Sequence, residues 1–213
     1  MLDVGCGTGT FPCLLAERGV ETIGLDPALA SLEVARDKPG ADRVRWLHGD
    51  AASLPRLVDG LEGPLQVDLA TMTGNVAQVF VSDDEWLATL RAVRRVVRPG
   101  GHLVFETRDP GREAWLQWTR EKSFERLAWG GAGVEHWVEV TEVLDDQVIF
   151  RWTFRFDDGE SVVSDSTLRF RSRDRVGAQL RASGFGVVDV RDAPDRPGHE
   201  HVFVARRPGP QEP

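Results

Sequence analysis

A glycine-rich loop near the amino terminus is the segment of this sequence best suited to hold a ligand. A short apolar run that includes Asp3 precedes it, and the residues Gly-Cys-Gly-Thr-Gly follow at positions 5–9. Glycines let a backbone approach a ligand where a Cβ atom would collide. Positions 10–16 read as a helix, whose first N–H groups have no intrahelical partner. A strand, a glycine loop and a helix in this order indicate a nucleotide-type binding site.

The spacing of the glycines narrows the class of ligand. Gly5, Gly7 and Gly9 form Gly-x-Gly-x-Gly, whereas dinucleotide-binding loops read Gly-x-Gly-x-x-Gly, and no lysine follows as it would in a P-loop. Asp26 ends the next predicted strand, where an acid can accept both hydroxyls of a ribose. Capping of the helix that begins near Pro27 is compatible with this role. Because NAD enzymes place an acid similarly, Asp26 alone does not discriminate between the two cofactors.

The sequence Asp-Val-Gly-Cys-Gly-Thr-Gly at positions 3–9 resembles the first motif of class I S-adenosylmethionine-dependent methyltransferases. The resemblance implies S-adenosyl-L-methionine as cofactor, with Asp3 near its amino end. It also implies that Asp50, after the third strand, accepts a hydrogen bond from the adenine amino group beside the N–H of Ala51. The order of elements in 2–107 and 173–205 follows that family, whereas 109–171 follows no motif that we can assign. The implied cofactor site comprises Asp3, Gly5, Cys6, Gly7, Gly9, Asp26, Pro27, Asp50, Ala51, Met72, Thr73 and Asn75.

These residues need strands that end at one common edge. The apolar pattern predicts strands at 20–26, 44–48, 67–72 and 102–107, separated by helices at 11–17, 28–38 and 83–97. With a closing strand pair at 185–190 and 200–205, this order predicts an α/β fold with a doubly wound, Rossmann-like, mainly parallel seven-stranded sheet. Ligands in such sheets bind at the carboxyl ends of the strands.

The segment 109–171 is predicted to be an inserted antiparallel β layer within one methyltransferase domain, 1–213. A helix is expected at 111–121, followed by strands at 135–144, 147–156 and 161–171. Apolar residues alternate between 148 and 156, so one face of the layer is buried. We expect this layer to lie over the ligand edge. Tryptophans gather between Trp115 and Trp152, where they form either the core of the layer or an aromatic pocket.

Candidates for contact with a methyl acceptor lie after the fourth and fifth strands and in the inserted layer. Asn75 either orients the acceptor or closes the cofactor pocket, and capping of the local backbone is an equal alternative. The acceptor candidates are Arg108, Trp115, His136 and Trp152. No catalytic residue is assigned, because a general base is needed only when the attacking atom arrives protonated. His199 and His201 are expected in the terminal hairpin, away from the ligand edge.

Composition excludes several partners and sites. The chain has 213 residues and a net charge of −8, which argues against nucleic acid or an anionic membrane as the main ligand. No apolar run approaches the roughly 20 residues of a membrane-spanning helix. The two cysteines, Cys6 and Cys13, match no metal motif and favour a reduced, cytoplasmic protein.

The sequence therefore predicts an enzyme that transfers a methyl group from S-adenosylmethionine to an O, N or C atom of a small molecule by in-line displacement. In the family that it resembles, helices usually precede the motif found here at Asp3. A non-catalytic S-adenosylmethionine-binding protein, or an inactive truncated methyltransferase, is therefore the alternative. A nicotinamide dehydrogenase shares the sheet and the ribose acid, but the glycine spacing and Asp50 disfavour it.

Overall fold

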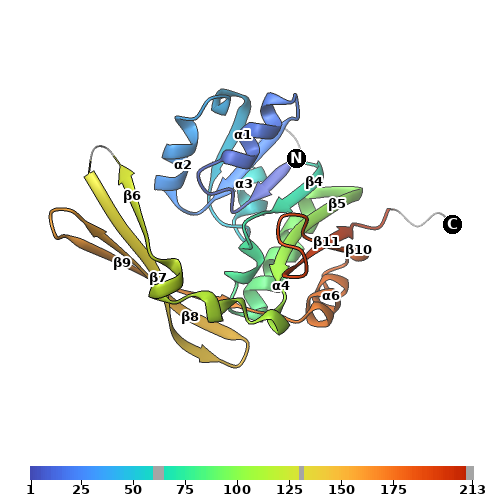
Figure 1. Cartoon of the computed structure of the whole chain (residues 1–213). Helices are drawn as coiled ribbons and strands as arrows, with labels where there is room; N and C mark the ends of the chain where they lie inside the picture. The colour runs from blue at the N-terminus through green and yellow to red at the C-terminus, as the bar shows by residue number, and fades with distance from the viewer. Residues whose placement is uncertain (60–64, 130–131, 210–213) are drawn as a thin grey trace.

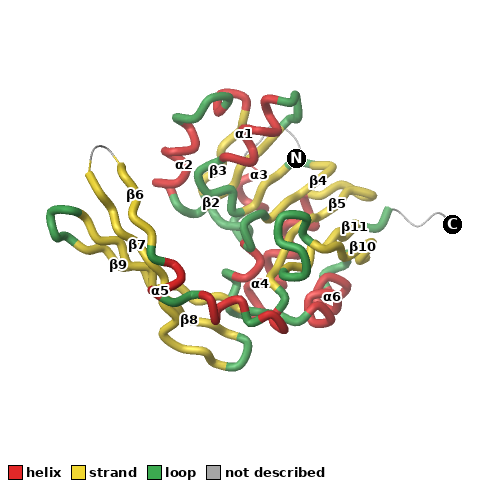
Figure 2. Tube along the Cα trace, viewed as in Figure 1, coloured by secondary structure: helices red, strands yellow, loops and turns green. Residues whose placement is uncertain are grey.

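Two β-sheets organise the protein (Figures 1 and 2). The computed structural model describes residues 1–59, 65–129 and 132–209. The larger sheet has seven strands in the order β10-β11-β5-β4-β1-β2-β3. Its strands are β1 (Leu2–Val4), β2 (Thr22–Asp26), β3 (Val44–His48), β4 (Val67–Met72), β5 (Val97–Arg108), β10 (Gly186–Asp192) and β11 (Glu200–Arg206).

Strands β1 to β5 are parallel, so their carboxyl ends share one edge. β1 pairs with β2 on one side and with β4 on the other, and β5 continues the parallel set beyond β4. β11 runs antiparallel beside β5 and pairs with β10. The predicted doubly wound, mainly parallel sheet is thus confirmed, and the ligand edge is the one where β1, β2, β4 and β5 end.

Helices cover the large sheet, and the core lies beneath them. Long helix α4 begins at Ser82, whose hydroxyl accepts a hydrogen bond from the Asp84 N–H. Its Trp86 and Leu90 are 1% and 0% exposed, and Trp86 packs edge-on against Phe105 of β5. The helices are α1 (Thr10–Glu17), α2 (Leu29–Arg36), α3 (Leu54–Asp59), α4 (Asp83–Val96), α5 (Arg120–Ser123) and α6 (Arg173–Ala182).

The second sheet is an antiparallel insertion between β5 and α6, with the order β6-β7-β8-β9. Its strands are β6 (Glu125–Trp129), β7 (Ala132–Leu144), β8 (Gln147–Phe156) and β9 (Ser161–Arg169). The sequence pattern predicted the last three strands but missed β6. Because β7 and β8 pair with Val138 opposite Trp152, the aromatic side chains of β8 share one face with His136. The opposite face carries ion pairs such as that of Arg151 with Asp165 at 2.6 Å. We call the face that contains His136 the aromatic face and the opposite one the charged face.

The single helix predicted at 111–121 is wrong. The chain instead makes two 3-10 turns, η3 (Pro110–Arg112) and η4 (Ala114–Gln117), before the four-residue helix α5. Glu113 separates the turns with a left-handed φ of 45°, which interrupts any continuous helix. Apolar spacing alone did not reveal this break.

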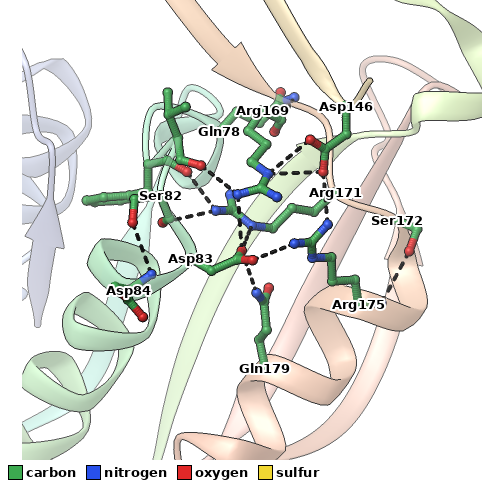
Figure 3. A network of polar contacts seen from close by, with 12 residues as sticks. Gln78, Ser82, Asp83, Asp84, Asp146, Arg169, Arg171, Ser172, Arg175 and Gln179 are labelled. Carbon is green, nitrogen blue, oxygen red and sulfur yellow. Dashed lines mark hydrogen bonds and ion pairs between the residues drawn. The ribbon is translucent and has the colours of Figure 1, made fainter. Parts of the chain in front are cut away.

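An arginine–aspartate network fastens the inserted sheet to the large one (Figure 3). Asp83, at the start of α4, accepts hydrogen bonds from Arg171 and Gln179 and pairs with Arg175. Arg175 also reaches Asp146, in the β7–β8 turn, at 3.0 Å. Since these residues come from α4, the insertion and α6, the network fixes the insertion against the large sheet.

Candidate functional site

The glycine loop after β1 has the backbone that its sequence indicates. Gly5, Gly7 and Gly9 all have positive φ, at 72°, 54° and 76°. A Cβ atom on Gly5 would lie 2.7 Å from Val76, and one on Gly9 would lie 2.4 Å from the ring of Trp46. A Cβ on Gly7 would meet nothing within 4 Å. The outer glycines are therefore required by packing, whereas the middle one leaves backbone open to a ligand.

Trp46 of β3 supports this loop, a role that the sequence did not indicate. Its indole ring occupies the space that side chains at Gly9 and Gly24 would fill. Its Nε1 donates a hydrogen bond to the Ala41 carbonyl at 3.1 Å. A glycine inside predicted strand 20–26 was the available signal, because such a glycine marks close approach of another group.

Asp26 ties the loop to the end of β2. Its two carboxylate oxygens accept hydrogen bonds from the Gly7 N–H at 2.7 Å and the Ala28 N–H at 2.8 Å. Each oxygen keeps a further lone pair for a ribose hydroxyl. The capping and ligand roles foreseen for Asp26 are thus geometrically compatible.

The loops after β2 and β3 carry the next candidates. Pro27 and Asp50 are exposed, and Ala51 is buried. Asp50 accepts a hydrogen bond from the Ser53 N–H at 2.8 Å, which fixes the carboxylate in a turn. An exposed, fixed carboxylate is available to an amino group of a ligand.

Asp3 is the most unusual acid of the site. It is 1% exposed, one oxygen accepts a hydrogen bond from the Thr71 hydroxyl at 2.6 Å, and Oδ2 has no partner among the described residues. Burial raises the pKa of Asp3 to about 6, and the charges of Glu106 and Asp26 add to the shift. A buried carboxylate with one free oxygen fits a cationic group such as an ammonium.

Cys6 has no nucleophilic role in this setting. Burial, followed by the charges of Asp3 and Asp26, raises the pKa of its thiol to about 12. The thiol therefore stays neutral near physiological pH, and the thiolate is the reactive form.

The loop after β4 is held by two acids. Asn75 has a left-handed φ of 62°, its N–H donates to Glu106 at 2.8 Å, and its Nδ2 donates to Glu200 at 3.1 Å. Its Oδ1 is buried without a partner in the described structure. Met72 is fully buried and Thr73 is half-buried.

Four carboxylates run across the ligand edge, from Asp26 through Asp3 and Glu106 to Glu200. Burial raises the pKa of Glu106, and the charge of Glu200 contributes. Arg196 pairs with Glu200 at 2.7 Å. A sulfonium carrying an ammonium group is a cation, so the site is electrostatically matched to S-adenosylmethionine.

The prediction that His199 and His201 lie away from the ligand edge is wrong, because His201 pairs with Thr107 near the end of β5. β11 begins at Glu200 opposite Arg108, so the loop before β11 returns to the ligand edge rather than lying away from it. Together with Asn75, Glu106 and Arg196, these residues line a cavity of about 330 Å³. An antiparallel strand that follows β5 in space must start where β5 ends, which the sequence order did not reveal.

The four acceptor candidates fall into separate groups. Arg108 lies 5.5 Å over the ring of Trp118, which packs against Phe150 of the aromatic face. Trp115 packs edge-on against Phe170. His136 and Trp152 are neighbours on the aromatic face, with ring centroids 5.7 Å apart. The structure thus joins His136 with Trp152, and Arg108 with Trp118, which the sequence analysis had not selected.

His136 lies against aromatic rings with little polar contact. Its Nδ1 is buried without a partner in the described chain, and Nε2 is 3.5 Å from the Glu125 carboxylate. Among the residues described, no cluster of three or more His, Cys, Asp or Glu side chains could hold a metal ion. Within the same residues, no helix is long and apolar enough to cross a membrane.

The seven-stranded sheet has the fold of S-adenosylmethionine-dependent methyltransferases, such as the one from Clostridium acetobutylicum, which shares it with a TM-score of 0.74 and 17% identity, covering 98% of this chain and 83% of that one. Residues 1–101, just under half of the chain, match the model of the family described as a methyltransferase domain.

Relatives extend the likeness beyond the family model. The chain is 31% identical over 110 residues to the cypemycin N-terminal methyltransferase of a Streptomyces species, covering 52% of this chain and 42% of that protein. It is 30% identical over 116 residues to a ubiquinone biosynthesis O-methyltransferase of Idiomarina loihiensis, covering 54% and 45%. The chain thus spans less than half the length of these curated relatives. The CcbJ methyltransferase from Streptomyces caelestis shares the fold with a TM-score of 0.75 and 20% identity, covering 97% of this chain and 87% of that one.

Proposed function

We propose that this protein transfers the methyl group of S-adenosylmethionine to an O, N or C atom of a small molecule. The main support is the buried Asp3 carboxylate, whose Oδ2 has no partner within the described structure. It lies in β1, next to a glycine loop that has open space around Gly7. An uncompensated buried carboxylate costs stability, and a cationic ligand would compensate it. The relatives include a ubiquinone biosynthesis O-methyltransferase, and a protein of the same fold is named a sugar N-methyltransferase, so they leave the acceptor atom open.

In this proposal three loops at the carboxyl edge of the large sheet each bind one part of the cofactor. The Gly7 backbone and Asp3 hold the methionine end, and Asp26 accepts the ribose hydroxyls. Asp50 and Ala51 bind the adenine. The remaining members of the site, placed beside these groups, are Gly5, Cys6, Gly9, Pro27, Met72, Thr73 and Asn75.

Catalysis in this proposal is mainly positioning. The bound cofactor supplies an electrophilic methyl group on its sulfonium. The protein aligns the acceptor atom with that methyl group and excludes water, which lowers the entropic part of the barrier. Arg108, Trp115, His136 and Trp152 contact the acceptor, and segment 109–171 serves as its covering layer within one domain.

Calorimetry with S-adenosylhomocysteine, S-adenosylmethionine and NAD tests the cofactor assignment. We expect both sulfur ligands to bind and NAD not to bind. Asp3→Asn should weaken binding about 10- to 100-fold, because a charge-assisted hydrogen bond is lost. Asp68→Asn, which changes an exposed acid at the opposite edge of the sheet, should leave binding unchanged. NAD binding without S-adenosylhomocysteine binding would overturn the assignment.

Methyl transfer itself requires a second assay with labelled cofactor and a panel of small hydroxyl, amine and carbon acceptors. Transfer to a panel member supports the enzyme. Tight cofactor binding without transfer to any member would favour the alternative of a non-catalytic S-adenosylmethionine-binding protein.

A further inference from the structure

Arg108 is a half-buried cation that forms no ion pair with any residue the structure describes. It is the last residue of β5 and lines the cavity of about 330 Å³ at the carboxyl edge. Glu200 stands directly opposite it on β11, but Glu200 Oε1 already accepts hydrogen bonds from Arg196 at 2.7 Å and Asn75 at 3.1 Å. In the part of the chain that the structure describes, no carboxylate oxygen lies within 4.0 Å of the Arg108 guanidinium. Its charge is therefore available to a ligand.

The side chain that orients Arg108 is neutral. Gln78, in the 3-10 turn η2 (Val76–Gln78), is 1% exposed, and its Oε1 accepts a hydrogen bond from Arg108 Nη1 at 2.9 Å. Gln78 Nε2 points to the Arg169 carbonyl at 3.5 Å, which directs the amide oxygen toward Arg108. A glutamate at this position would pair with the guanidinium directly, whereas the amide holds it without adding a countercharge.

An aromatic surface borders this guanidinium. The Trp118 ring lies 5.5 Å from Arg108 Cζ and packs on Phe150 with ring centroids 4.9 Å apart. Phe150 begins the row of aromatic side chains on β8. Contact with the Trp118 ring restrains the guanidinium, and Gln78 occupies its Nη1. The N–H groups that do not face Gln78 can then bind a planar anion.

The acids of the same cavity already have partners. Glu200 is paired with Arg196, and Glu106 accepts the Asn75 N–H at 2.8 Å. A cationic acceptor would compete with Arg196 for Glu200, and burial, which raises the pKa of Glu106, weakens that acid as a counter-ion. An anionic acceptor would complete the contacts of Arg108 without displacing any, so an anion is favoured.

We propose that Arg108 binds a carboxylate of the methyl acceptor, with Gln78 as a positioning residue, so that the substrate is a small acid with an aromatic or apolar body. This inference rests on the proposed methyltransferase function and adds the chemical class of its acceptor. Burial lowers the pKa of Arg108, yet an arginine keeps its charge at any physiological pH.

The test uses benzoate, phenyl phosphate, benzamide and benzylamine, each titrated into the full chain saturated with S-adenosylhomocysteine and followed by NMR. We expect benzoate to bind at least tenfold more tightly than benzamide or benzylamine. Tighter binding of phenyl phosphate than of benzoate would replace carboxylate by phosphate and so overturn that part of the proposal. Benzylamine as the best ligand, or no binding of benzoate, would overturn it entirely.

Variants then assign the contact to named residues. Arg108→Gln should weaken benzoate about 10- to 100-fold, and Arg108→Lys should weaken it less, because lysine keeps the charge without the fork. Gln78→Glu should weaken benzoate as well, since the new carboxylate competes for the guanidinium. The matched control is Arg98→Gln, at the other end of β5, where Arg98 pairs with Asp68; it should change nothing. Undiminished benzoate binding in Arg108→Gln contradicts the proposal.

Two readouts separate this inference from the proposed function. Calorimetry of S-adenosylhomocysteine on the unaltered chain reports the methyltransferase site alone. If S-adenosylhomocysteine does not bind, the proposed function fails. If it binds while benzoate does not, only the acceptor class fails. Unchanged S-adenosylhomocysteine affinity in Arg108→Gln also shows that this variant is folded.

Discussion

The two halves of the ligand edge are built by different means. The half formed by the loops after β1 and β2 uses backbone groups of consecutive residues, and it needs glycines where side chains would collide with Trp46 and Val76. The half near the end of β5 uses side chains that meet from distant points in the sequence, such as Gln78, Arg108 and Glu200. The first half leaves a motif in the sequence, because backbone access demands particular residues at fixed spacing. The second half leaves none.

Gly9→Val should produce the largest loss. The substitution forces a β-branched residue into a φ of 76° and drives it into the Trp46 ring. We expect about 3–5 kcal/mol of lost stability from backbone strain and overpacking, together with loss of cofactor binding. Chemical denaturation measures the free energy of unfolding. The matched control is Gly7→Ala, which has open space around its Cβ and should cost about 1 kcal/mol. Equal losses in the two variants would show that Trp46 does not support the loop.

Asp3→Asn should stabilise the cofactor-free protein at high pH. The pKa of Asp3 is about 6 in the folded chain, above the 3.8 of an aspartate in water, so the folded state favours the protonated form. The unfolding free energy should therefore fall as pH rises from about 4 to above 6, by about 3 kcal/mol from this group. Asparagine removes this dependence, so the cofactor-free variant should be more stable at pH 8 and nearly unchanged at pH 4.

Denaturation of both proteins at pH 4, 6 and 8 checks this expectation. An unchanged pH dependence in Asp3→Asn would mean that Asp3 does not titrate in this range. Loss of S-adenosylhomocysteine affinity in the same variant would then separate binding from stability.

Asp83→Asn should loosen the attachment of the inserted sheet. Although burial alone raises the pKa of Asp83, hydrogen bonds from Arg175, Gln179 and Arg171 lower it to about 2. The resulting stabilisation is present above about pH 4 and is lost as pH falls toward 2. Because the side chain is 34% exposed, we expect a loss of about 1–2 kcal/mol at neutral pH.

Thermal unfolding at pH 7 and at pH 3 measures this contribution. Asp84→Asn changes the neighbouring, exposed acid of the same helix turn and serves as the control. S-adenosylhomocysteine binding should survive in both variants, since the network lies outside the cofactor half. If Asp83→Asn abolished that binding, the two halves would not be independent.

His136→Phe should have the smallest effect. The substitution removes the buried Nδ1 and keeps an aromatic ring between Trp152 and Phe154. We expect a change in unfolding free energy of less than about 1 kcal/mol and unchanged cofactor affinity. A large loss of methyl transfer with normal cofactor binding would support the acceptor contact that we propose for His136. A loss of cofactor binding would contradict the division between the two halves.

The sequence predicted the order of strands in the large sheet well, and its assignment of cofactor contacts stays a prediction. Alternating strands and helices placed Asp26 and the glycine loop at one edge, because parallel strands in such a fold end together. The helix at 111–121 was wrong, since the left-handed Glu113 is not visible in an apolar pattern. β6 and the return of Glu200 to the ligand edge were missed, because strand pairing joins residues far apart in the chain.

Local chemistry thus determined the cofactor class: glycine spacing and the acids after successive strands act through short-range backbone geometry. Only the tertiary structure decided which side chains meet beyond that loop. It placed Trp46 under Gly9 and Gly24, and it left Arg108 beside a neutral Gln78 while Arg196 engages Glu200. These contacts depend on strand register and on the packing of the inserted segment, so no short stretch of sequence encodes them.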